Sequence, residues 1–380
     1  MSLPSDRTAE VWVLLRDLSR TGVPVVLLRL LRALGSDAPR IHVIARRPGP
    51  LHDEVAASAT TVRVLEPGAP RSGPASVANA LRLAGRELAA QRTLDAAWRL
   101  RSRGLPHPDV VVVHGAGGWP LVRLAPSAPR VLWLHELEVA LDRSIPPTQQ
   151  SEALAACERV LAVSRAVADV AVRRGARPDA VSLLPGMVEV EGGPGPTAPD
   201  PRSVAVMGAG TPGWRKGTDR LAALAFELER RGWPDSVGWV GGAPVAAAAP
   251  RVGAPDPVRW LDPLDEPWEV LGGASVVVVP SREDPLPLVA LEAGLHGLPV
   301  VAMPTGGLPE LLGADRGRVA PRQDLRWFAD ATIELLEDPE QARRLGRRLR
   351  DHVVRHHDSR VVAKVWLEQV LGVVQRTRHR

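Results

Sequence analysis

The sequence predicts an α/β protein made of two doubly wound parallel-sheet domains, and three observations support this fold class. Short runs of apolar residues, rich in valine and leucine, alternate along the chain with longer segments of helical periodicity. These runs are apolar throughout, as in strands that are buried on both faces of a parallel sheet. The alternation occurs twice, before and after a Gly- and Pro-rich segment at 191–202, and 380 residues suffice for two hydrophobic cores.

Residues 1–190 are expected to form the first domain. Its first strand covers 11–15 and leads through a polar loop into a helix over 25–34. The other elements expected in this half are strands over 41–45, 61–65, 110–114, 131–134 and 160–164, one long Ala/Leu/Arg helix over 76–103, and a helix that ends at 174. Strands that alternate with helices in this way favour a doubly wound sheet.

The second domain is expected over 203–358, after a linker at 191–202 that lacks any periodicity. The elements expected in it are strands over 203–207, 237–240, 276–279 and 299–303, a helix over 218–231, a helix that carries Glu292, and helical structure after 324. A last helix over about 359–375 closes the chain, and we assign 359–380 to it.

The amino-acid composition indicates the cellular location and the partners to expect for this protein. A single cysteine, Cys157, excludes an internal disulfide framework, and the first residues lack the pattern of a signal peptide. No apolar stretch approaches the ~20 residues that span a bilayer, so we expect a cytoplasmic protein. The net charge of +5 comes almost entirely from arginine, because lysine occurs only at Lys216 and Lys364. The dispersed arginines suggest solvated helix faces, and they leave peripheral attachment at the inner membrane face open.

Several functional classes find no support in the sequence. We find no Cys/His metal spacing and no Asp-x-Asp pair for a divalent ion, so no metal site is expected. The segment His135-Glu-Leu-Glu is not a zinc helix, because Val139 stands where a second histidine is needed. With no tyrosine, two phenylalanines and eleven scattered tryptophans, the chain nearly lacks the stacking platforms of single-strand nucleic-acid binders, and no nucleic-acid partner is expected.

The most informative stretch runs from 275 to 310. An apolar strand stops at Pro280, an acidic loop follows, and then come a helix, a short strand and the turn Gly306-Gly307. Polar groups thus gather after the strands, where ligands bind in open α/β sheets. Asp284 and Glu292 are eight residues apart, so both carboxylates can face one pocket mouth. The alternative is that Asp284 caps the following helix and Glu292 lies on the surface.

This stretch resembles the signature of the retaining glycosyltransferases of the GT-B fold, of the family 4 or group 1 type. In that family an acid-x7-acid pair precedes a Gly-Gly turn and a Pro-Glu. The first acid is usually glutamate, whereas here it is Asp284, or Glu283 with a slip of one residue. The resemblance covers most of the chain, best over 203–330. It implies two Rossmann-like domains facing a cleft, with the C-terminal helix crossing back to the first domain.

The loop at 208–217 contains Gly208, Gly210 and Gly213 in the spacing GxGxxG. A dinucleotide site also needs an acid after the next strand, where Gly241-Gly242 stands, so that interpretation is weak. A loop whose amides and cations meet a diphosphate at a helix N-terminus fits better. An ordinary Gly-rich turn is the remaining alternative.

Two cations of this loop are candidates for the diphosphate. Lys216 supplies a point charge and Arg215 a bidentate fork. The resembling family usually has an arginine five residues before the lysine, where this chain has Thr211. We therefore expect Arg215 or Arg282 to take that role.

The resemblance implies roles for further residues. Glu292 would hold the ribose hydroxyls of a nucleotide, Asp284 would lie near the donor sugar, and His135 would face that sugar from the first domain. The backbone amides around Thr305 are further diphosphate candidates. The expected catalytic residues are His135, Asp284, Arg215 and Lys216. The expected donor-binding residues are Gly22, Gly210, Arg215, Lys216, Arg282, Glu283, Asp284, Leu288, Val289, Glu292, Gly306 and Gly307. The expected acceptor-binding residues are His114 and His135.

The function predicted on this basis is transfer of a sugar from a nucleotide diphosphate sugar to an acceptor hydroxyl. Retention of anomeric configuration and independence of metal are expected, with no cofactor beyond the donor substrate. The acceptor could be a carbohydrate, a lipid-linked molecule or a small molecule. Two alternatives remain open: an epimerase-like enzyme acting on a sugar nucleotide, and a non-catalytic subunit that binds a nucleotide sugar or a carbohydrate.

Overall fold

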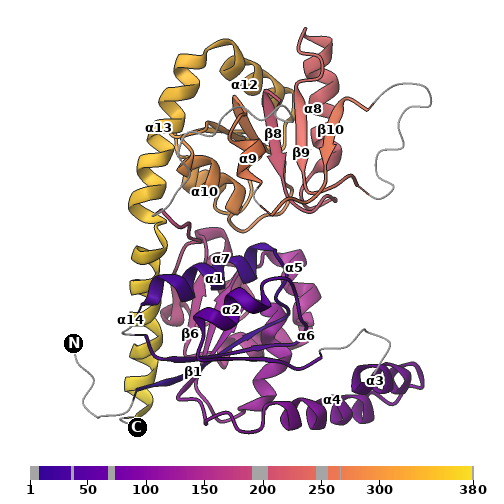
Figure 1. Ribbon diagram of the computed structural model, residues 1–380, viewed down its shortest axis with the longest axis vertical. Helices are drawn as coiled ribbons and strands as arrows, with labels where there is room; N and C mark the ends of the chain where they lie inside the picture. The colour runs from indigo at the N-terminus through magenta and orange to yellow at the C-terminus, as the bar shows by residue number, and fades with distance from the viewer. Residues whose placement is uncertain are drawn as a thin grey trace. The chain divides into compact units, whose positions relative to one another are not determined.

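The computed structural model describes residues 8–35, 38–66, 73–190, 204–244, 256–265 and 267–378. The linker expected at 191–202 lies outside these residues. The chain divides into two compact units. The first contains Met1–Val163, Val167–Leu184 and Val362–Arg380, and the second contains Ser164–Ala166 and Pro185–Val361. Figure 1 shows each unit as a sheet with helices packed on it.

The first unit has a seven-stranded parallel sheet in the order β3-β2-β1-β4-β5-β6-β7. Its strands are β1 (Glu10–Leu15), β2 (Arg40–Ala45), β3 (Thr61–Val64), β4 (Val110–His114), β5 (Arg130–Leu134), β6 (Arg159–Ala162) and β7 (Val181–Leu183). Its helices are α1 (Gly22–Leu34), α2 (His52–Ser58), α3 (Gly73–Leu83), α4 (Glu87–Arg101), α5 (Glu138–Ser144), α6 (Pro147–Ala155) and α7 (Arg165–Arg173), with 3₁₀ turns at Ala116–Leu124 and Pro178–Ala180. The valines of β4 are all buried, as the apolar run predicts.

The second unit repeats this topology with six parallel strands in the order β10-β9-β8-β11-β12-β13. Its strands are β8 (Val206–Ala209), β9 (Val237–Val240), β10 (Val258–Leu261), β11 (Val276–Val279), β12 (Val300–Ala302) and β13 (Arg318–Val319). Its helices are α8 (Thr218–Arg230), α9 (Trp268–Leu271), α10 (Leu288–Leu295), α11 (Leu308–Leu312), α12 (Leu325–Glu337) and α13 (Pro339–His356). In both units the order runs outward in two directions from the first strand, as in the Rossmann arrangement. The prediction of two doubly wound parallel sheets is confirmed.

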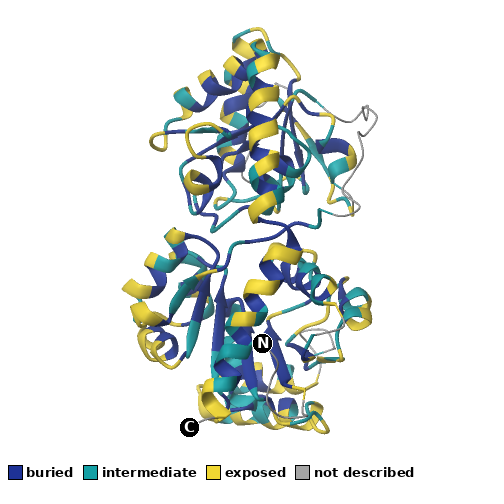
Figure 2. Ribbon diagram, turned by 90° about the vertical axis from the view of Figure 1, so that its left-hand side faces the viewer, coloured by how far each residue is buried: buried dark blue, intermediate teal, exposed yellow. Residues whose placement is uncertain are grey.

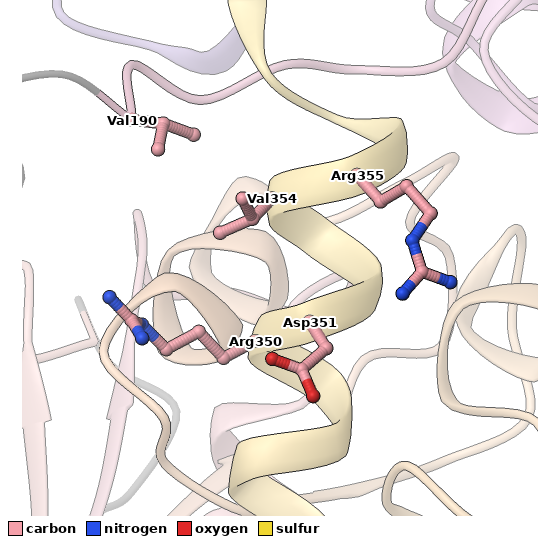
Figure 3. Close-up of a pocket in the computed structure, with 5 residues that line it drawn as sticks. All are labelled: Val190, Arg350, Asp351, Val354 and Arg355. Atoms are coloured by element: carbon pink, nitrogen blue, oxygen red, sulfur yellow. The ribbon is translucent and has the colours of Figure 1, made fainter.

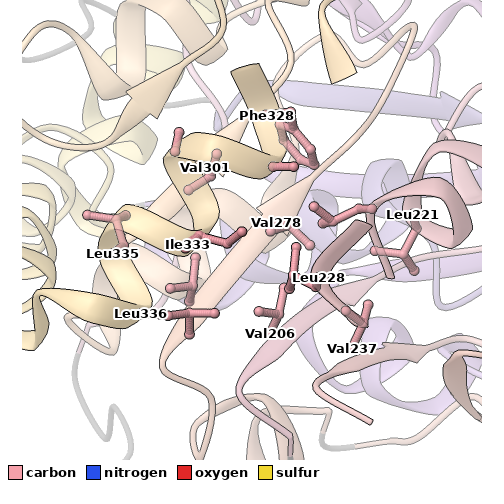
Figure 4. Packing of buried hydrophobic residues seen from close by; sticks show 14 of the residues in the cluster. Val206, Leu221, Leu228, Val237, Val278, Val301, Phe328, Ile333, Leu335 and Leu336 are labelled. Carbon is pink, nitrogen blue, oxygen red and sulfur yellow. The ribbon is translucent and has the colours of Figure 1, made fainter. Parts of the chain in front are cut away.

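Apolar side chains on one face of the second sheet form a core with α8 and α12. Val206, Val278 and Leu228 meet Phe328 and other buried residues there (Figure 4). Gly208 makes this packing possible, because a Cβ at that position would lie 2.7 Å from the ring of Trp239. Figure 2 shows strands of both units buried while the outer faces of many helices are exposed. Burial of these apolar surfaces is the main stabilising term of each unit.

The last helix, α14 (Ser359–Arg378), joins the first unit from Val362 onward. Trp366, Val370 and Val373 are buried along it. Near its end the Arg378 guanidinium lies 3.1 Å from Asp109 Oδ1, just before β4. The expected return of the C-terminal helix to the first domain is therefore observed. No helix in the described ranges is long and apolar enough to cross a membrane.

One expected element is wrong, and some were missed. The single helix expected over 76–103 is two helices, α3 and α4, separated at 84–86. Gly85 has φ +71, a left-handed conformation that ends α3. Strands β7, β10 and β13 were not predicted, because they are short and carry polar residues such as Ser182, Arg259 and Arg318.

Candidate functional site

The candidate site of the second unit lies where its strand order reverses. Strands β8 and β11 are neighbours at the centre of the sheet, although their connections lead to opposite edges. Loop 210–217 follows β8, and loop 280–287 follows β11. The two loops bond directly: the backbone N–H of Arg282 donates to the carbonyl of Arg215 at 2.8 Å. Such a switch point is the usual ligand position in doubly wound sheets.

Lys216 and Asp284 form the central ion pair of this site. Nζ of Lys216 lies 2.6 Å from Oδ2 of Asp284, and the carboxylate is almost fully buried. The hydroxyl of Ser281 also donates to Oδ2, at 3.4 Å. The stem of Lys216 passes over Gly210, where a Cβ would lie 3.1 Å from Cε of the lysine. The pair brings two predicted catalytic residues together and sets a cation directly before the N-terminus of α8.

Asp284 does not cap α10. The N-cap residue of that helix is Pro287, which has no side-chain cap, so the capping alternative for Asp284 is wrong. Leu288 and Val289 form the first turn of α10. They pack against another group of buried apolar residues in this unit, distinct from the core with α8 and α12. Glu283 is buried beside Arg215, with Oε2 3.8 Å from the guanidinium Nε.

Arg282 is engaged away from the ion pair. Its guanidinium binds Asp219 in α8 through both terminal nitrogens, with Nη1 2.6 Å from Oδ1. These bonds hold the pKa of Asp219 below its ordinary value. The same nitrogen donates to the carbonyl of Trp214, and the group lies 5.5 Å from the Trp214 ring centre. Arg282 therefore fixes the two loops to each other, and the replacement of the arginine missing at Thr211 by Arg215 or Arg282 stays a prediction.

The Gly-Gly turn closes against the acidic loop. Gly306 has φ +51, and a Cβ there would lie 1.8 Å from the carbonyl oxygen of Asp284. The amide of Gly307 donates to the carbonyl of Pro285 at 2.8 Å. The hydroxyl of Thr305 receives the amide of Asp284 at 3.3 Å and donates to the carbonyl of Arg282 at 3.2 Å. This close approach of backbone to backbone requires glycine at 306.

Glu292, the second acid of the pair, lies in the middle of α10 and is held by a tryptophan. The indole Nε1 of Trp268, in α9, donates to Oε2 of Glu292 at 3.1 Å. The ring of Trp268 stacks on His296, with centroids 4.5 Å apart and planes 25° apart. Burial lowers the pKa of His296, although the Glu292 charge acts in the opposite sense. The Trp268 indole thus holds the Glu292 carboxylate in place, and the nearby His296 ring is neutral at pH 7.

A second group of polar side chains follows the strands of the first unit. Glu136 is buried just after β5, and its two oxygens accept from the amides of Ala116 and His135, each at 2.9 Å. This carboxylate joins the loop after β4 to the loop after β5. It therefore sets the backbone position from which the His135 ring projects.

The rings of His114 and His135 meet edge to face, with centroids 4.7 Å apart. His114 ends β4 and is buried, and its Nε2 donates to the carbonyl of Val23 at 2.8 Å. Burial lowers the pKa of His114 to about 4, and burial together with the neighbouring His114 lowers the pKa of His135 well below 6.5. Both rings are neutral at pH 7. Nε2 of His135 is buried and has no hydrogen-bond partner in the described part of the chain.

Other predicted positions are placed as follows. Gly22 is the first residue of α1, directly after the β1 loop. A pocket of about 450 Å³, lined by Val190, Arg350, Asp351, Val354 and Arg355, lies on α13 and shares no residue with the predicted site (Figure 3). In the ranges that the structure describes, no group of three or more His, Cys, Asp or Glu side chains could hold a metal ion.

Comparison with known proteins identifies the family. The family model described as Glycosyltransferase Family 4 matches residues 20–191, and the model described as Glycosyl transferases group 1 matches residues 201–338. The D-inositol 3-phosphate glycosyltransferase of Corynebacterium diphtheriae is 30% identical over 70% of this chain and 70% of its own length. The protein of that name from Corynebacterium efficiens is 28% identical over 87% of this chain and 86% of its own length.

Solved structures agree on the fold. HepE of Anabaena in complex with UDP-glucose has a TM-score of 0.71 at 16% identity, covering 96% of this chain and 99% of that one. A sucrose-phosphate synthase from Thermosynechococcus elongatus has a TM-score of 0.70 at 19% identity, covering 98% and 99%. The fold is GT-B, and the protein is a glycosyltransferase. It belongs to glycosyltransferase family 4, among the group 1 glycosyl transferases.

Sequence reasoning missed three residues that shape the site. Trp268 holds Glu292, Glu136 positions His135, and Asp219 binds Arg282. Glu136 had a visible signal, because it directly follows the histidine at a strand end. Nothing in the sequence indicates the contacts of Trp268 and Asp219, which depend on side-chain directions across a loop.

Proposed function

We propose that this glycosyltransferase moves a sugar from a nucleotide diphosphate sugar to an acceptor hydroxyl, with retention of configuration and without a metal ion. The observation that carries the proposal is the Lys216–Asp284 pair, 2.6 Å apart at the adjoining ends of β8 and β11. A cation and a carboxylate held together at a switch point suit a diphosphate and the sugar attached to it.

The donor is assigned to the second unit. Lys216, Arg215 and the N-terminus of α8 would stabilise the negative charge of the diphosphate. This charge grows as the bond to the sugar breaks. The carboxylate of Glu292 would accept hydrogen bonds from the two ribose hydroxyls, because each of its oxygens can take one. The amide of Gly306 would add a neutral donor, whereas that of Gly307 is already bound to the carbonyl of Pro285.

Asp284 would lie beside the anomeric carbon, where positive charge develops. His135 in the first unit would donate to or accept from a sugar hydroxyl through its unpartnered Nε2. In the transfer step the anomeric C–O bond to the phosphate breaks, and the acceptor oxygen bonds to the same face of the sugar. The acceptor proton passes to the departing phosphate oxygen, so no separate protein base is required.

The proposed partners are a nucleotide-sugar donor and an acceptor that is a carbohydrate, a lipid-linked molecule or a small alcohol. Two similar proteins suggest the first donor and acceptor to test. One is named D-inositol 3-phosphate glycosyltransferase, and the structure of the other contains UDP-glucose. Peripheral contact with a membrane belongs to the same proposal, since the excess of arginine would attract anionic lipid.

The test is a thermal-shift titration with nucleoside diphosphates and their sugars in the presence of EDTA. Lys216→Ala should abolish the shift, whereas Lys364→Ala, which removes the other lysine from an exposed position in α14, should not. Amine labelling followed by mass spectrometry should show ligand protection of Lys216 and not of Lys364. Equal shifts in both variants would remove Lys216 from the donor site.

Turnover decides between the proposal and its alternatives. Incubation of a stabilising donor with an acceptor panel should give a glycoside whose anomeric configuration, read by NMR, matches the donor. An inverted product would contradict retention. Conversion of the donor sugar without acceptor would indicate an epimerase, and tight binding without any turnover would indicate a non-catalytic subunit.

A further inference from the structure

Helices α3 and α4 form a hairpin that extends from the sheet of the first unit (Figure 1). α3 packs chiefly on α4 and buries a single described residue, Ala78, whereas α4 is anchored by Ala90, Leu94 and Trp98. The tip of the hairpin, residues 82–88, consists of seven exposed residues in succession. The hairpin is therefore attached through one end of α4, and its tip touches little else in the described structure.

Two leucines at this tip are exposed far beyond what a solvated turn needs. Leu83 is 84% exposed and Leu88 is 73% exposed, the highest values among the large apolar residues that the structure describes. They flank the turn at Gly85, one on each helix. Placing both side chains in water is unfavourable, and both can enter an apolar layer together because they lie at the same end of the hairpin.

Basic groups surround these leucines. Residues 73–103 carry six arginines and two acids. Glu87 pairs with Arg82 at 3.2 Å, and the other acid, Asp95, pairs with Arg123 at 3.3 Å, away from the tip. Arg86 and Arg92 make no ion pair within the described ranges. Both line a surface hollow of about 590 Å³ together with Gly85, Glu87, Leu88 and Ala89.

We propose that the tip of the α3–α4 hairpin docks on a membrane surface rich in anionic phospholipid. Leu83 and Leu88 enter the boundary between headgroups and acyl chains, and Arg86 and Arg92 bind lipid phosphates beside them. Apolar side chains at an extremity, flanked by unpaired arginines, are the pattern of interfacial membrane contact. A protein partner is less favoured, because the centre of a protein interface is depleted of charge, whereas residues 82–88 contain three charged residues beside the two leucines. The inference rests on the membrane contact included in the proposed function and assigns it to these residues, but it does not depend on glycosyl transfer.

The first experiment is flotation of the full chain with vesicles of phosphatidylcholine alone and of phosphatidylcholine mixed with phosphatidylglycerol. The chain should float with the anionic vesicles only, and high salt should release it. Leu83→Ser with Leu88→Ser should reduce the bound fraction about tenfold, and Arg86→Gln with Arg92→Gln should reduce it by a similar factor. The control Leu325→Ser with Arg326→Gln, which removes an exposed leucine and an exposed arginine from α12, should float like the wild type.

A second measurement places the tip in the membrane. Cys157 is the single cysteine and is buried, so a thiol introduced by Leu88→Cys can be labelled selectively with an environment-sensitive dye. Anionic vesicles should shift the dye emission to the blue at position 88 and leave it unchanged after Leu325→Cys. This readout also covers the case in which the double leucine variant folds poorly.

The proposal is overturned if the wild-type chain does not float with anionic vesicles, or if the tip variants float as well as the control. It is also overturned if the leucine variant keeps vesicle binding but loses self-association in light scattering, since the hairpin would then be a protein interface. Thermal unfolding at the wild-type temperature shows that the tip variants are folded, so that their loss of flotation supports the proposal.

Discussion

The Lys216 ammonium is bound to the Asp284 carboxylate, with 2.6 Å between Nζ and Oδ2, across 68 residues of sequence. A diphosphate that binds Lys216 must compete with this carboxylate for the same cation. Under the proposed function, this ion pair opposes donor binding, and the Asp284 charge would act on the sugar during transfer.

Asp284→Asn is expected to separate these two effects. Loss of the competing charge should tighten nucleoside diphosphate binding about fivefold, as expected for a partly exposed pair worth ~1 kcal/mol. Transfer should fall about a hundredfold, because the variant lacks the charge that we propose to face the anomeric carbon. Calorimetric titration and initial rates measure the two quantities. Asp315→Asn, at an exposed ion pair elsewhere in the unit, is the control. Weaker nucleotide binding in Asp284→Asn would contradict the competition.

The sequence predicted the two parallel sheets well, for a physical reason. Runs such as Val276–Val279 are buried on both faces, so their apolar composition indicates that they are central strands of a parallel sheet. Lys216 and Asp284 lie in the loops that follow such strands, and parallel strands bring these loops to one edge. Strand-end position therefore predicted that these two residues lie close together, whereas Glu292, in the middle of α10, was proposed from the family resemblance.

The features that were not predicted depend on backbone conformation and side-chain direction, which composition does not encode. The hairpin at 73–101 was predicted as one helix because its Ala, Leu and Arg residues all favour helix, while one left-handed glycine, Gly85, breaks it. The contact of Arg282 with Asp219, a partner 63 residues away that only the folded loops bring near, was not predicted, and the expected role of Arg282 at a diphosphate stays a prediction. Trp268 was assigned no role, because a four-residue helix gives no periodic pattern.

Trp268→Phe is expected to weaken donor binding without unfolding the protein. The phenyl ring keeps most of the stacking on His296 but loses the N–H that fixes Oε2 of Glu292. A hydrogen bond to a charged group contributes about 1.5–3 kcal/mol, of which part is regained from water, so the donor KM should rise about five- to tenfold with little change in kcat. Trp260→Phe is a matched control, because Trp260 also donates from Nε1 to a carboxylate, that of Asp256. Equal effects of both substitutions would show that Trp268 has no positioning role.

Gly306→Ala is expected to disrupt the loop that carries Asp284. Its new Cβ would lie 1.8 Å from the carbonyl oxygen of Asp284, and φ of +51 would add backbone strain. Thermal unfolding should show a loss of about 3 kcal/mol, with donor binding lost as well. Gly232→Ala is the comparison, since φ there is +92 and no atom lies within 4 Å, so it carries strain without a clash and should cost about 1 kcal/mol. Equal losses would mean that the contact with Asp284 relaxes freely.

The buried histidines of the first unit should make its stability depend on pH. Burial lowers the pKa of His114 from 6.5 to about 4. Between these values the unfolded chain binds a proton that the folded chain excludes, so the free energy of unfolding falls as pH drops below 6.5. The loss from His114 is about 2 kcal/mol at pH 5 and approaches ~3 kcal/mol below pH 4.

His114→Gln removes this proton while its amide can still donate to the carbonyl of Val23. The fall in Tm between pH 7.5 and pH 5 should be smaller in this variant than in the wild type by roughly 4–8 °C. Some dependence should persist, because burial also lowers the pKa of His135, whose ring faces His114. His52→Gln, at an exposed ring on α2, should keep the wild-type dependence. If His114→Gln loses as much Tm as the wild type over this range, His114 is protonated in the folded protein, and the neutral pair that we assign to this site does not exist.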